Sequence, residues 1–449
     1  MVRLFGTDGI RGKAGTFLTA QMAFNLGAAG AKVLVKFGGA KKPSVLIGMD
    51  TRQSSDMLAA ALAAGICSIG ADVYLAGVVP TPAVAYLVRK YGLSAGVMVS
   101  ASHNAFGDNG IKFYDGQGHK LTDDIENQIE AALSAKEQEL PQATGADIGR
   151  ILSGIMATAD YVDFLQGAVQ ANLQGKRIVL DCANGATLMA APAIFELLGA
   201  DVTVIANEPD GTNINENCGS THVNLLADFI RDGEYDMGFA FDGDGDRCFA
   251  VDENGEIIDG DMIMAIIGKH WASNGKLPKN TIVATVMSNL GFFHDIEAAG
   301  LTAEQTKVGD RYVLERMIEG GYSLGGEQSG HIICLNHHTT GDGILTALLL
   351  ASITQETGKT LGQLNTMKKM PQVLINAKIG NATKEDIEAD AEIQAETAVL
   401  HKKYEGRGRV LIRPSGTEPL IRVMIEGADM AEITADAKKL AQMMEDFKG

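Results

Sequence analysis

Long hydrophobic runs are absent from this sequence. No apolar stretch approaches the ~18 residues that a membrane-spanning helix needs, and the N-terminal stretch MVRLFGTDGIRG is not apolar enough for a signal peptide. Cysteine is scarce, and no pair has the CxxC spacing among Cys67, Cys182, Cys218, Cys248 and Cys334. We therefore expect reduced thiols in a cytoplasmic protein that has no membrane partner.

Basic residues are too few to balance the acidic ones. The 38 Lys and Arg residues stand against 56 Asp and Glu, which gives a net charge of −18. A global negative field repels nucleic acid and anionic membranes, so we expect neither as a partner. An anionic small-molecule substrate would need positive charge concentrated at its site, which directs attention to arginines and lysines beside glycine-rich loops.

Aromatic residues are also sparse, at 6%, whereas hydrophobic residues make up 46% of the 449 positions. This composition is typical of a soluble globular protein. At ~100–200 residues per domain, the length predicts three or four domains. The 53 glycines indicate many turns and close backbone approaches.

A weak internal repeat runs through the first 330 residues. Each of three copies begins with an apolar, β-branched run, continues with a strand-like stretch that starts at a glycine, and closes with a strand that enters a polar loop. The opening runs are SVLIGMD at 44–50, RIVLDCANG at 177–185 and TIVATVMSN at 281–289. Intervening stretches have helical spacing, so the pattern predicts α/β units. Because ligands collect at the carboxyl ends of strands in such units, we expect chemistry in the three polar loops.

The pattern changes after about residue 368. A strand (RVLIR), a loop (PSGTEP), a second strand (LIRVMIEG) and a final helix predict a small α+β domain. In that helix the apolar residues recur at helical spacing, at Ile433, Ala437, Leu440 and Met444. The domains are therefore predicted at 1–152, 153–255, 256–368 and 369–449.

Three aspartates alternate with glycines where the second copy ends. Asp242, Asp244 and Asp246 are followed by Arg247, and the glycines allow the chain to curl so that the carboxylates converge. Three carboxylates held together repel one another unless a cation neutralises them. Because hard oxygen ligands favour Mg²⁺ or Ca²⁺, the loop predicts a divalent metal site.

An EF-hand calcium loop is the alternative for the same segment. Glu253 falls at the twelfth position of such a loop, which would make the chain a non-catalytic calcium-binding protein. However, Arg247 occupies the sixth position, where an EF-hand needs glycine. The flanking segments MGFAF and CFAVD also look like strands, whereas an EF-hand is flanked by helices.

The loop SASHN closes the first copy and holds Ser102. A serine on a strand-end loop, beside His103 and an amine such as Lys112, can act as a nucleophile, although such serines more often cap helices or bind their own backbone. The metal loop favours the nucleophile, because Mg²⁺ together with a hydroxyl suits phosphoryl transfer.

The loop GEQSGH closes the third copy. Glu327 and Ser329 can bind sugar hydroxyls or an amine, and His331 can act as an acid or base near neutral pH. In the N-terminal segment FGTDGIRG, Arg11 is a candidate source of positive charge for a phosphate site. Arg52, in the MDTR turn, is a second candidate for that role.

The C-terminal loop has the composition of an anion cradle. Ser415, Gly416 and Thr417 offer small hydroxyls and accessible backbone amides. The flanking Arg413 and Arg422 can clamp a phosphate by bidentate hydrogen bonds. A glycine turn with structural arginines is the alternative.

These segments, in this order, resemble the α-D-phosphohexomutase family. FGTDGIRG, SASHN, DGDGDR, GEQSGH and RPSGTEPLIRVMIE carry the resemblance, which runs across nearly the whole chain. It implies an α/β protein with three related α/β domains and a smaller C-terminal α+β domain around a central active-site cleft. It also implies a magnesium-dependent isomerase that moves a phosphoryl group between two positions of a sugar phosphate.

The resemblance implies a role for each loop. Ser102 would carry the phosphoryl group as a phosphoserine and bind Mg²⁺ with the three aspartates. Lys112 and Arg11 would lie near the phosphoserine. The other expected roles are sugar or substrate binding by Arg247, Glu327 and Ser329, acid–base catalysis by His331, and capture of the distal phosphate by Arg413, Ser415, Gly416, Thr417 and Arg422.

Within the family, FGTDGIRG, TVMSN and Gln328 resemble the branch that acts on glucosamine phosphate. The implied reaction converts glucosamine 6-phosphate to glucosamine 1-phosphate through glucosamine 1,6-bisphosphate, and it would feed UDP-N-acetylglucosamine and cell-wall precursor synthesis. A phosphoglucomutase or phosphomannomutase is the alternative, because relatives that act on neutral sugars share Glu327.

Ala105 stands where many relatives have proline, which predicts a less rigid serine loop. A homodimer is left open.

Overall fold

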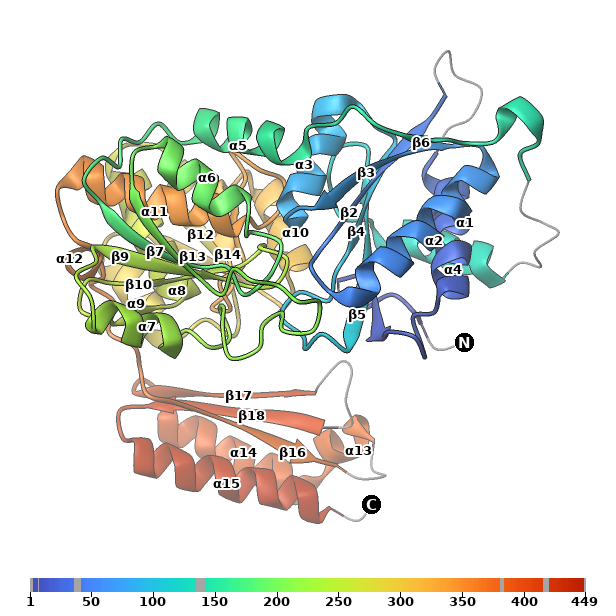
Figure 1. Cartoon of the computed structure of the whole chain (residues 1–449). Coiled ribbons are helices and arrows are strands. Elements are labelled where there is room, and N and C mark those ends of the chain that lie inside the picture. The colour runs from blue at the N-terminus through green and yellow to red at the C-terminus, as the bar shows by residue number, and fades with distance from the viewer. Residues whose placement is uncertain are drawn as a thin grey trace. The chain divides into compact units, whose positions relative to one another are not determined.

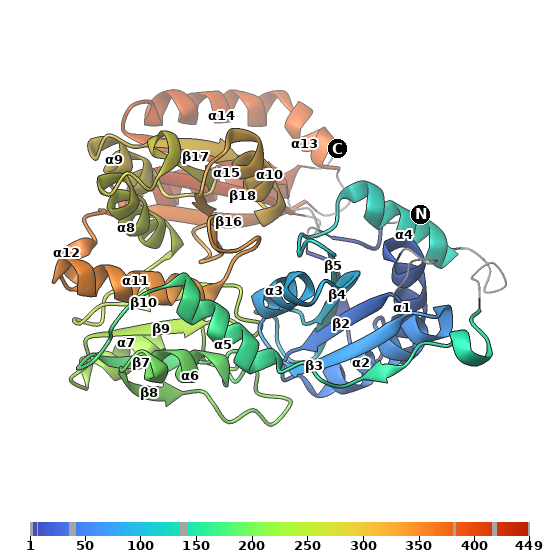
Figure 2. The ribbon, with the colours of Figure 1, turned by 90° about the horizontal axis from the view of Figure 1, so that it is seen from above.

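The structure is a computed structural model that describes residues 3–6, 8–35, 42–134, 142–379, 383–414 and 420–447. Its chain divides into two compact units (Figures 1 and 2). The first unit comprises Met1–Met287 and Leu301–Thr366, and the second comprises Ser288–Gly300 and Met367–Gly449.

The first sheet has the strand order β1-β5-β4-β2-β3-β6. Strand β2 pairs in parallel with β3 and β4, whereas β5 pairs antiparallel with β4 and β1. Its strands are β1 (Ile10–Lys13), β2 (Ser44–Met49), β3 (Asp72–Val78), β4 (Ala95–Val99), β5 (Asp108–Asp115) and β6 (Ile151–Leu152). The helices of this part are α1 (Ala20–Leu34), α2 (Gln53–Ile69), α3 (Thr81–Tyr91), α4 (Asp123–Ser134) and the 3₁₀ turn η2 (Gly145–Asp147).

The second and third sheets also belong to the first unit. The second has the order β11-β10-β9-β7-β8, from β7 (Arg177–Asp181), β8 (Asp201–Ile205), β9 (Met237–Phe241), β10 (Cys248–Val251) and β11 (Ile257–Ile258). The third has the order β13-β12-β14-β15, from β12 (Thr281–Thr285), β13 (Thr302–Thr306), β14 (Leu324–Gly326) and β15 (Ile332–Cys334). The helices here are α5 (Ala157–Ala168), α6 (Ala190–Leu197), α7 (Asn224–Arg231), α8 (Gly260–Ser273), η3 (Pro278–Asn280), α10 (Asp310–Gly320), α11 (Gly343–Thr357) and α12 (Leu361–Leu364).

The three sheets share one strand order, which confirms the repeat. In each, the first strand of the copy lies between the second and third in parallel pairing, and a fourth strand returns antiparallel to the third. These sets are β3-β2-β4-β5, β8-β7-β9-β10 and β13-β12-β14-β15. The sequence predicts the return strand in the second copy alone, at CFAVD. It does not predict β5 and β15, because these strands follow directly on loops whose polar residues mask the start of each strand.

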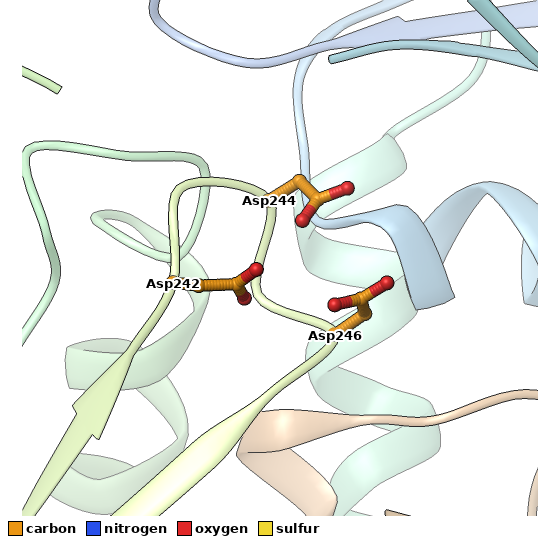
Figure 3. Close-up of side chains that lie close together, drawn as sticks. All are labelled: Asp242, Asp244 and Asp246. Atoms are coloured by element: carbon orange, nitrogen blue, oxygen red, sulfur yellow. The ribbon is translucent and has the colours of Figure 1, made fainter. Parts of the chain in front are cut away.

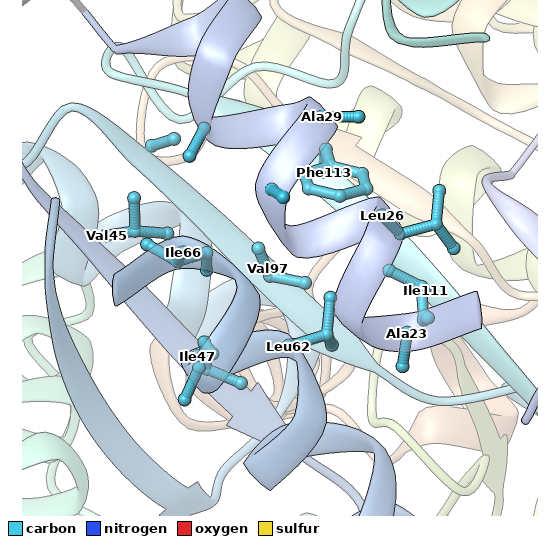
Figure 4. Close-up of a cluster of buried hydrophobic side chains, with 14 of the residues drawn as sticks. Ala23, Leu26, Ala29, Val45, Ile47, Leu62, Ile66, Val97, Ile111 and Phe113 are labelled. Atoms are coloured by element: carbon cyan, nitrogen blue, oxygen red, sulfur yellow. The ribbon is translucent and has the colours of Figure 1, made fainter. Parts of the chain in front are cut away.

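Strand β2 shows why the first sheet is covered on both faces. Val45 and Ile47 join the apolar cluster beneath α1 and α2 (Figure 4), whereas Gly48, one residue on, lies against Val84 of α3. Alternate side chains of a strand point to opposite faces, so a strand buried on both sides reads as a continuous apolar run. The run SVLIGM therefore specifies a central strand.

The second unit is built on a three-stranded antiparallel sheet. Its order is β16-β18-β17, from β16 (Gln372–Lys378), β17 (Gly408–Pro414) and β18 (Leu420–Gly427), with helices α9 (Leu290–Ala298), α13 (Lys384–Ala389), α14 (Ala391–Tyr404) and α15 (Met430–Asp446). All four apolar residues predicted to line the last helix are buried in α15. They pack in one cluster with Ile421, Val423 and Ile425 of β18.

The predicted fold class is confirmed: three related α/β domains precede a smaller α+β domain. The domain limits at 152, 255 and 368 stay predictions. None of the helices in the described ranges is long and apolar enough to span a bilayer. All five cysteines are free thiols.

Helices α1 and α2 approach closely at glycines, which gives a stability prediction. A Cβ at Gly65 would lie 2.9 Å from the Phe24 carbonyl carbon, too close for a real contact. Because overpacking costs about 1–3 kcal/mol, Gly65→Ala should lower the melting temperature of the first unit by several degrees.

Gly167→Ala is the matched control, because Gly167 also lies in a helix but has open space around its Cα. It should leave the melting temperature unchanged or raise it. Equal effects of the two substitutions in differential scanning calorimetry would contradict the close packing of α1 on α2.

Candidate active site

The three polar loops occupy the same position in their three sheets. Each connects the third parallel strand to the antiparallel return strand: β4 to β5, β9 to β10, and β14 to β15. Each loop thus starts at the carboxyl end of a buried strand, where α/β folds gather ligand-binding residues. In the first two loops, residues more than 100 positions apart in the chain meet directly.

Ser102 has an unusual backbone. Its φ is +52°, in the left-handed region that non-glycine residues rarely adopt. Its N–H donates to Ser100 Oγ (2.9 Å), and its carbonyl oxygen accepts from Arg52 Nη2 (2.9 Å) and Asn215 Nδ2 (2.9 Å). Surrounding contacts therefore hold a conformation that would otherwise cost of order 1–3 kcal/mol.

Arg52 shapes this loop and does not supply free charge to a phosphate. The residue is only 2% exposed, and its side chain pairs with Asp50 (2.8 Å). It donates to the carbonyl oxygens of four residues of the serine loop, Ser102, Asn104, Ala105 and Asp108. The earlier expectation for Arg52 is therefore wrong. The Ala105 carbonyl accepts one of these bonds at 2.6 Å, so the loop is anchored at this position although proline is absent.

The three aspartates of the second loop converge. Carboxylate oxygens from Asp242, Asp244 and Asp246 lie within 4.8 Å of one another, and all three residues are buried (Figure 3). Asp244 Oδ1 and Asp246 Oδ1 are buried without a hydrogen-bond partner among the described residues. Because unpaired buried oxygens are costly, this donor set fits a divalent cation.

The serine hydroxyl meets the aspartate cluster. Ser102 Oγ donates to Asp242 Oδ2 at 2.6 Å, although the two residues are 140 positions apart. The backbones are equally close, since a Cβ at Gly243 would lie 2.6 Å from the Ser102 carbonyl oxygen. Burial and the neighbouring carboxylates of Asp246 and Asp244 raise the pKa of Asp242. A cation bound here would reverse that effect.

Lys112 provides the nearest positive charge. Its Nζ lies 2.7 Å from Asp244 Oδ2, 2.8 Å from Asp8 Oδ2 and 3.7 Å from Asp246 Oδ2, and the residue is 2% exposed. Burial acts against ionisation, but these carboxylates outweigh it and raise the pKa of Lys112. At Asp244, burial acts to raise the pKa of the carboxyl, but the charge and hydrogen bond of Lys112 outweigh burial and lower that pKa.

Arg11 and Arg247 flank the same cluster. Arg11 pairs with Asp8, and Arg247 Nε lies 3.9 Å from Asp246 Oδ1 and 4.0 Å from Asp242 Oδ2. The Arg247 N–H donates to Asp242 Oδ1 at 3.2 Å, which closes the loop. Burial, with the charges of Arg247 and Arg11, lowers the pKa of His103 to about 4, so His103 is neutral at pH 7 beside the serine hydroxyl.

The third loop presents Glu327, Ser329 and His331. Glu327 Oε1 accepts from the Gly309 N–H (3.1 Å), and the Glu327 N–H donates to the His331 carbonyl oxygen (3.1 Å). His331 is 4% exposed, and its Nε2 lies 3.7 Å from Asp310 Oδ2. Ser329 lies in the turn between Glu327 and His331 and is half-buried.

The EF-hand alternative does not fit this geometry. Strands β9 and β10 flank the aspartate loop. Glu253, the twelfth residue of the supposed calcium loop, accepts from Thr360 Oγ1 and from the Gly362 N–H (3.2 Å) at the start of α12. Its carboxylate is therefore already used by another element.

In the second unit, Arg413 and Arg422 face each other directly across β17 and β18. Like charges opposite one another destabilise a sheet, and an anion between them would relieve the repulsion. Arg422 Nε is buried without a hydrogen-bond partner in the described part of the chain. Ser415, Gly416 and Thr417, predicted to complete this loop, lie outside the described residues.

Comparison with known proteins decides the family. Four family models, each for one domain of phosphoglucomutase/phosphomannomutase, match this chain. The models of alpha/beta/alpha domains I, II and III match residues 2–140, 159–255 and 259–370, and the model of the C-terminal domain matches residues 374–443. This chain belongs to the phosphoglucomutase/phosphomannomutase family.

Full-length relatives have the same extent. A phosphoglucosamine mutase from Clostridium novyi (strain NT) is 54% identical over 447 residues, which cover 99% of this chain and 99% of that protein. The crystal structure of a phosphoglucomutase/phosphomannomutase family protein from Burkholderia thailandensis has a TM-score of 0.82 at 22% identity and covers 100% of this chain and 98% of that one. N-acetylphosphoglucosamine mutase from Aspergillus fumigatus, solved with GlcNAc-6P and magnesium, has a TM-score of 0.69 at 19% identity and covers 99% and 95%. Both structures show that the fold is shared.

In this phosphoglucomutase/phosphomannomutase family member, sequence reasoning missed several residues of the site. Thr81 Oγ1 donates to Asp244 Oδ2 at 2.6 Å from the first turn of α3. Asn215 holds the Ser102 carbonyl, and Lys120 bridges Asp8 and Asp310. Asp8, which precedes Gly9, was visible within FGTDGIRG, but Thr81, Asn215 and Lys120 stand in no motif and are brought in only by folding.

Arg52 gives the prediction for this site. Lysine keeps the positive charge, but its single ammonium group cannot donate to several carbonyl oxygens at once, as the planar guanidinium of arginine does. Arg52→Lys should therefore destabilise the protein by about 2–4 kcal/mol, because buried carbonyl oxygens of the serine loop lose their donors. Urea unfolding followed by circular dichroism measures the change.

Arg177→Lys is the control, because Arg177 makes an exposed ion pair with Glu234. That change should shift stability by less than about 0.5 kcal/mol. If Arg52→Lys were as mild as the control, the anchoring of the serine loop by Arg52 would be disproved.

Proposed function

We propose that the protein interconverts glucosamine 6-phosphate and glucosamine 1-phosphate by passing a phosphoryl group through Ser102. The observation that carries this proposal is the contact of Ser102 Oγ with Asp242, within a buried cluster of three carboxylates. A nucleophilic hydroxyl beside a metal-binding cluster is the arrangement that phosphoryl transfer requires. The 54% identity to proteins named phosphoglucosamine mutase supports the aminosugar over glucose or mannose phosphate.

Asp242, Asp244 and Asp246 would hold Mg²⁺, with Ser102 or its phosphoryl oxygen as a further ligand. The two carboxylate oxygens of Asp244 have different surroundings. Oδ2 accepts hydrogen bonds from Thr81 and Lys112, whereas Oδ1 has no partner among the described residues. Bound Mg²⁺ would neutralise charge on the phosphoryl oxygens and orient the transferred group. Magnesium bound by the Aspergillus fumigatus relative supports this assignment.

The positive residues of the site have separate tasks in this proposal. Lys112 and Arg11 would balance the charge of phospho-Ser102, because both already neutralise carboxylates beside it. Arg247 lies beside the aspartate loop, and the charge of Glu327 also acts on it, so it would contact the substrate. Glu327 and Ser329 would bind the sugar ring, and His331 would transfer a proton.

The phosphate that is not being transferred would bind the C-terminal loop. Arg413 and Arg422 lie opposite each other, and the hydroxyls and amides of Ser415, Gly416 and Thr417 would complete the cradle. Transfer from phospho-Ser102 to O1 of glucosamine 6-phosphate would form glucosamine 1,6-bisphosphate. After the intermediate turns around, the 6-phosphoryl group would return to Ser102 Oγ and glucosamine 1-phosphate would leave.

The same proposal places the protein in the cytoplasm, where five free thiols would stay reduced. Its partner is a small-molecule sugar phosphate, and its product would enter synthesis of UDP-N-acetylglucosamine and cell-wall precursors. Neither nucleic acid nor an anionic membrane suits a chain of net charge −18. A homodimer stays a prediction.

Removal of the nucleophile tests the phosphoserine. Ser102→Ala should lower turnover by at least about 10⁴-fold and should remove the phosphate from the protein, because the proposal gives the transferred phosphoryl group no other carrier. Coupled assays and intact-mass spectrometry measure the two effects.

Ser68→Ala serves as the matched control, since Ser68 Oγ only donates to the Gly65 carbonyl. It should keep full activity and the phosphate. Phosphorylation or turnover that persisted in Ser102→Ala would assign the nucleophile elsewhere.

A substrate comparison tests the sugar. With Mg²⁺ and a trace of the sugar bisphosphate, we expect kcat/KM for glucosamine 6-phosphate to exceed that for glucose 6-phosphate by at least about 10-fold, the size of one good specificity contact. Chelation of the metal should stop both reactions. A preference for glucose or mannose 6-phosphate would instead make the chain a phosphoglucomutase or phosphomannomutase.

A further inference from the structure

His331 has an acidic neighbour from another element. Its Nε2 is buried, lies 3.7 Å from Asp310 Oδ2 at the start of α10, and makes no hydrogen bond with the described residues. A hydrogen bond of this kind is about 2.7–3.2 Å long, and catalytic hydrogen bonds are often longer before the substrate binds. A small movement or one bridging water would join the two groups.

The imidazole ring has little freedom to turn away. A Cβ at Gly341 would lie 2.7 Å from His331 Cε1 and closer still to Cδ2 and Nε2, so the ring edge that carries Nε2 packs closely against the Gly341 backbone. The backbone of His331 is held as well, because its carbonyl oxygen accepts from the Glu327 N–H. These contacts hold the ring in a position where Nε2 lies 3.7 Å from Asp310 Oδ2.

Asp310 is itself fixed from two sides. Its Oδ1 accepts from the Arg311 N–H at 2.9 Å, at the positive end of α10. Its Oδ2 pairs with Lys120, which also binds Asp8. Burial acts to raise the pKa of Asp310, but Lys120 and His331 outweigh it and lower that pKa, so the carboxylate stays ionised.

We propose that Asp310 is a positioning residue that keeps the proton of His331 on Nε2 and thereby leaves Nδ1 free to accept a proton from the sugar hydroxyl. A carboxylate that receives one ring N–H fixes the tautomer and stabilises the imidazolium that forms when the other nitrogen is protonated. Lys120 would keep Asp310 in place. This inference rests on the proposed function and adds a residue that no loop motif contains.

Each proton that moves in this step has a donor and an acceptor. When the sugar oxygen bonds to phosphorus, its proton passes to His331 Nδ1. The bond between phosphorus and Ser102 Oγ breaks, and Oγ keeps the electron pair and is protonated from solvent. The imidazolium then releases its proton to solvent, so no further reactant is needed.

Histidine ¹⁵N spectra of the unliganded protein test the tautomer directly. The His331 signal is assigned by its loss in His331→Gln. We expect the Nε2–H form in the native protein. In Asp310→Asn the proton should move to Nδ1 in at least part of the molecules, and kcat should fall about 10²-fold while KM changes less than about threefold. Asp310→Glu should restore the native tautomer and part of kcat.

Asp123→Asn is the matched control, because Asp123 pairs with Arg311, the next residue of α10, and with Arg3. It should change neither tautomer nor kcat. A native Nδ1–H tautomer would overturn the proposal even if Asp310→Asn failed to fold. So would an Asp310→Asn protein with unchanged kcat, or one whose kcat falls while the tautomer stays the same. Failure of the proposed function would look different, since native protein would then not prefer glucosamine 6-phosphate over glucose or mannose 6-phosphate, while its tautomer remained measurable.

Discussion

Mutual repulsion among three buried carboxylates is the constraint on which the site depends. Asp242, Asp244 and Asp246 converge within 4.8 Å on one short loop, away from water. Such a cluster is stable only when cations offset it. The chain supplies one of them, Lys112, from the return strand of another sheet, and two carboxylate oxygens still lack partners within the described residues. The charge that remains unbalanced fits a divalent cation.

A second constraint acts on the serine loop. Ser102 adopts a left-handed backbone that its own side chain does not favour, and Arg52 and Asn215 hold its carbonyl oxygen. This arrangement points the hydroxyl at Asp242. The strain is thus stored at the proposed nucleophile, and a buried arginine that binds backbone carbonyls of the serine loop and the Asp50 carboxylate maintains it.

The repeat explains how one unit gathers these parts. Three sheets with the same strand order offer equivalent loops, and each loop carries different chemistry: a hydroxyl, a carboxylate cluster, and a glutamate with a histidine. Ion pairs then connect the copies, as in the series Asp244, Lys112, Asp8, Lys120 and Asp310, in which each residue contacts the next. This series connects the aspartate loop to the start of α10, where Asp310 lies beside His331.

The sequence by itself determined the three parallel strands of each copy, the loops that follow them, Ser102, the aspartate trio and the apolar face of α15. These features are local: periodicity, glycine spacing and adjacent polar residues specify them within about ten positions. Only the tertiary structure decided that Arg52 anchors a loop instead of binding phosphate, and that Thr81, Asn215, Lys120 and Asp310 belong to the site. Their partners lie 50 or more residues away in most cases, as with Thr81 and Asp244 or Lys120 and Asp310, and single polar residues carry no local pattern that reveals such a partner. Long-range pairing is chosen by the packing of whole sheets, which no short segment encodes.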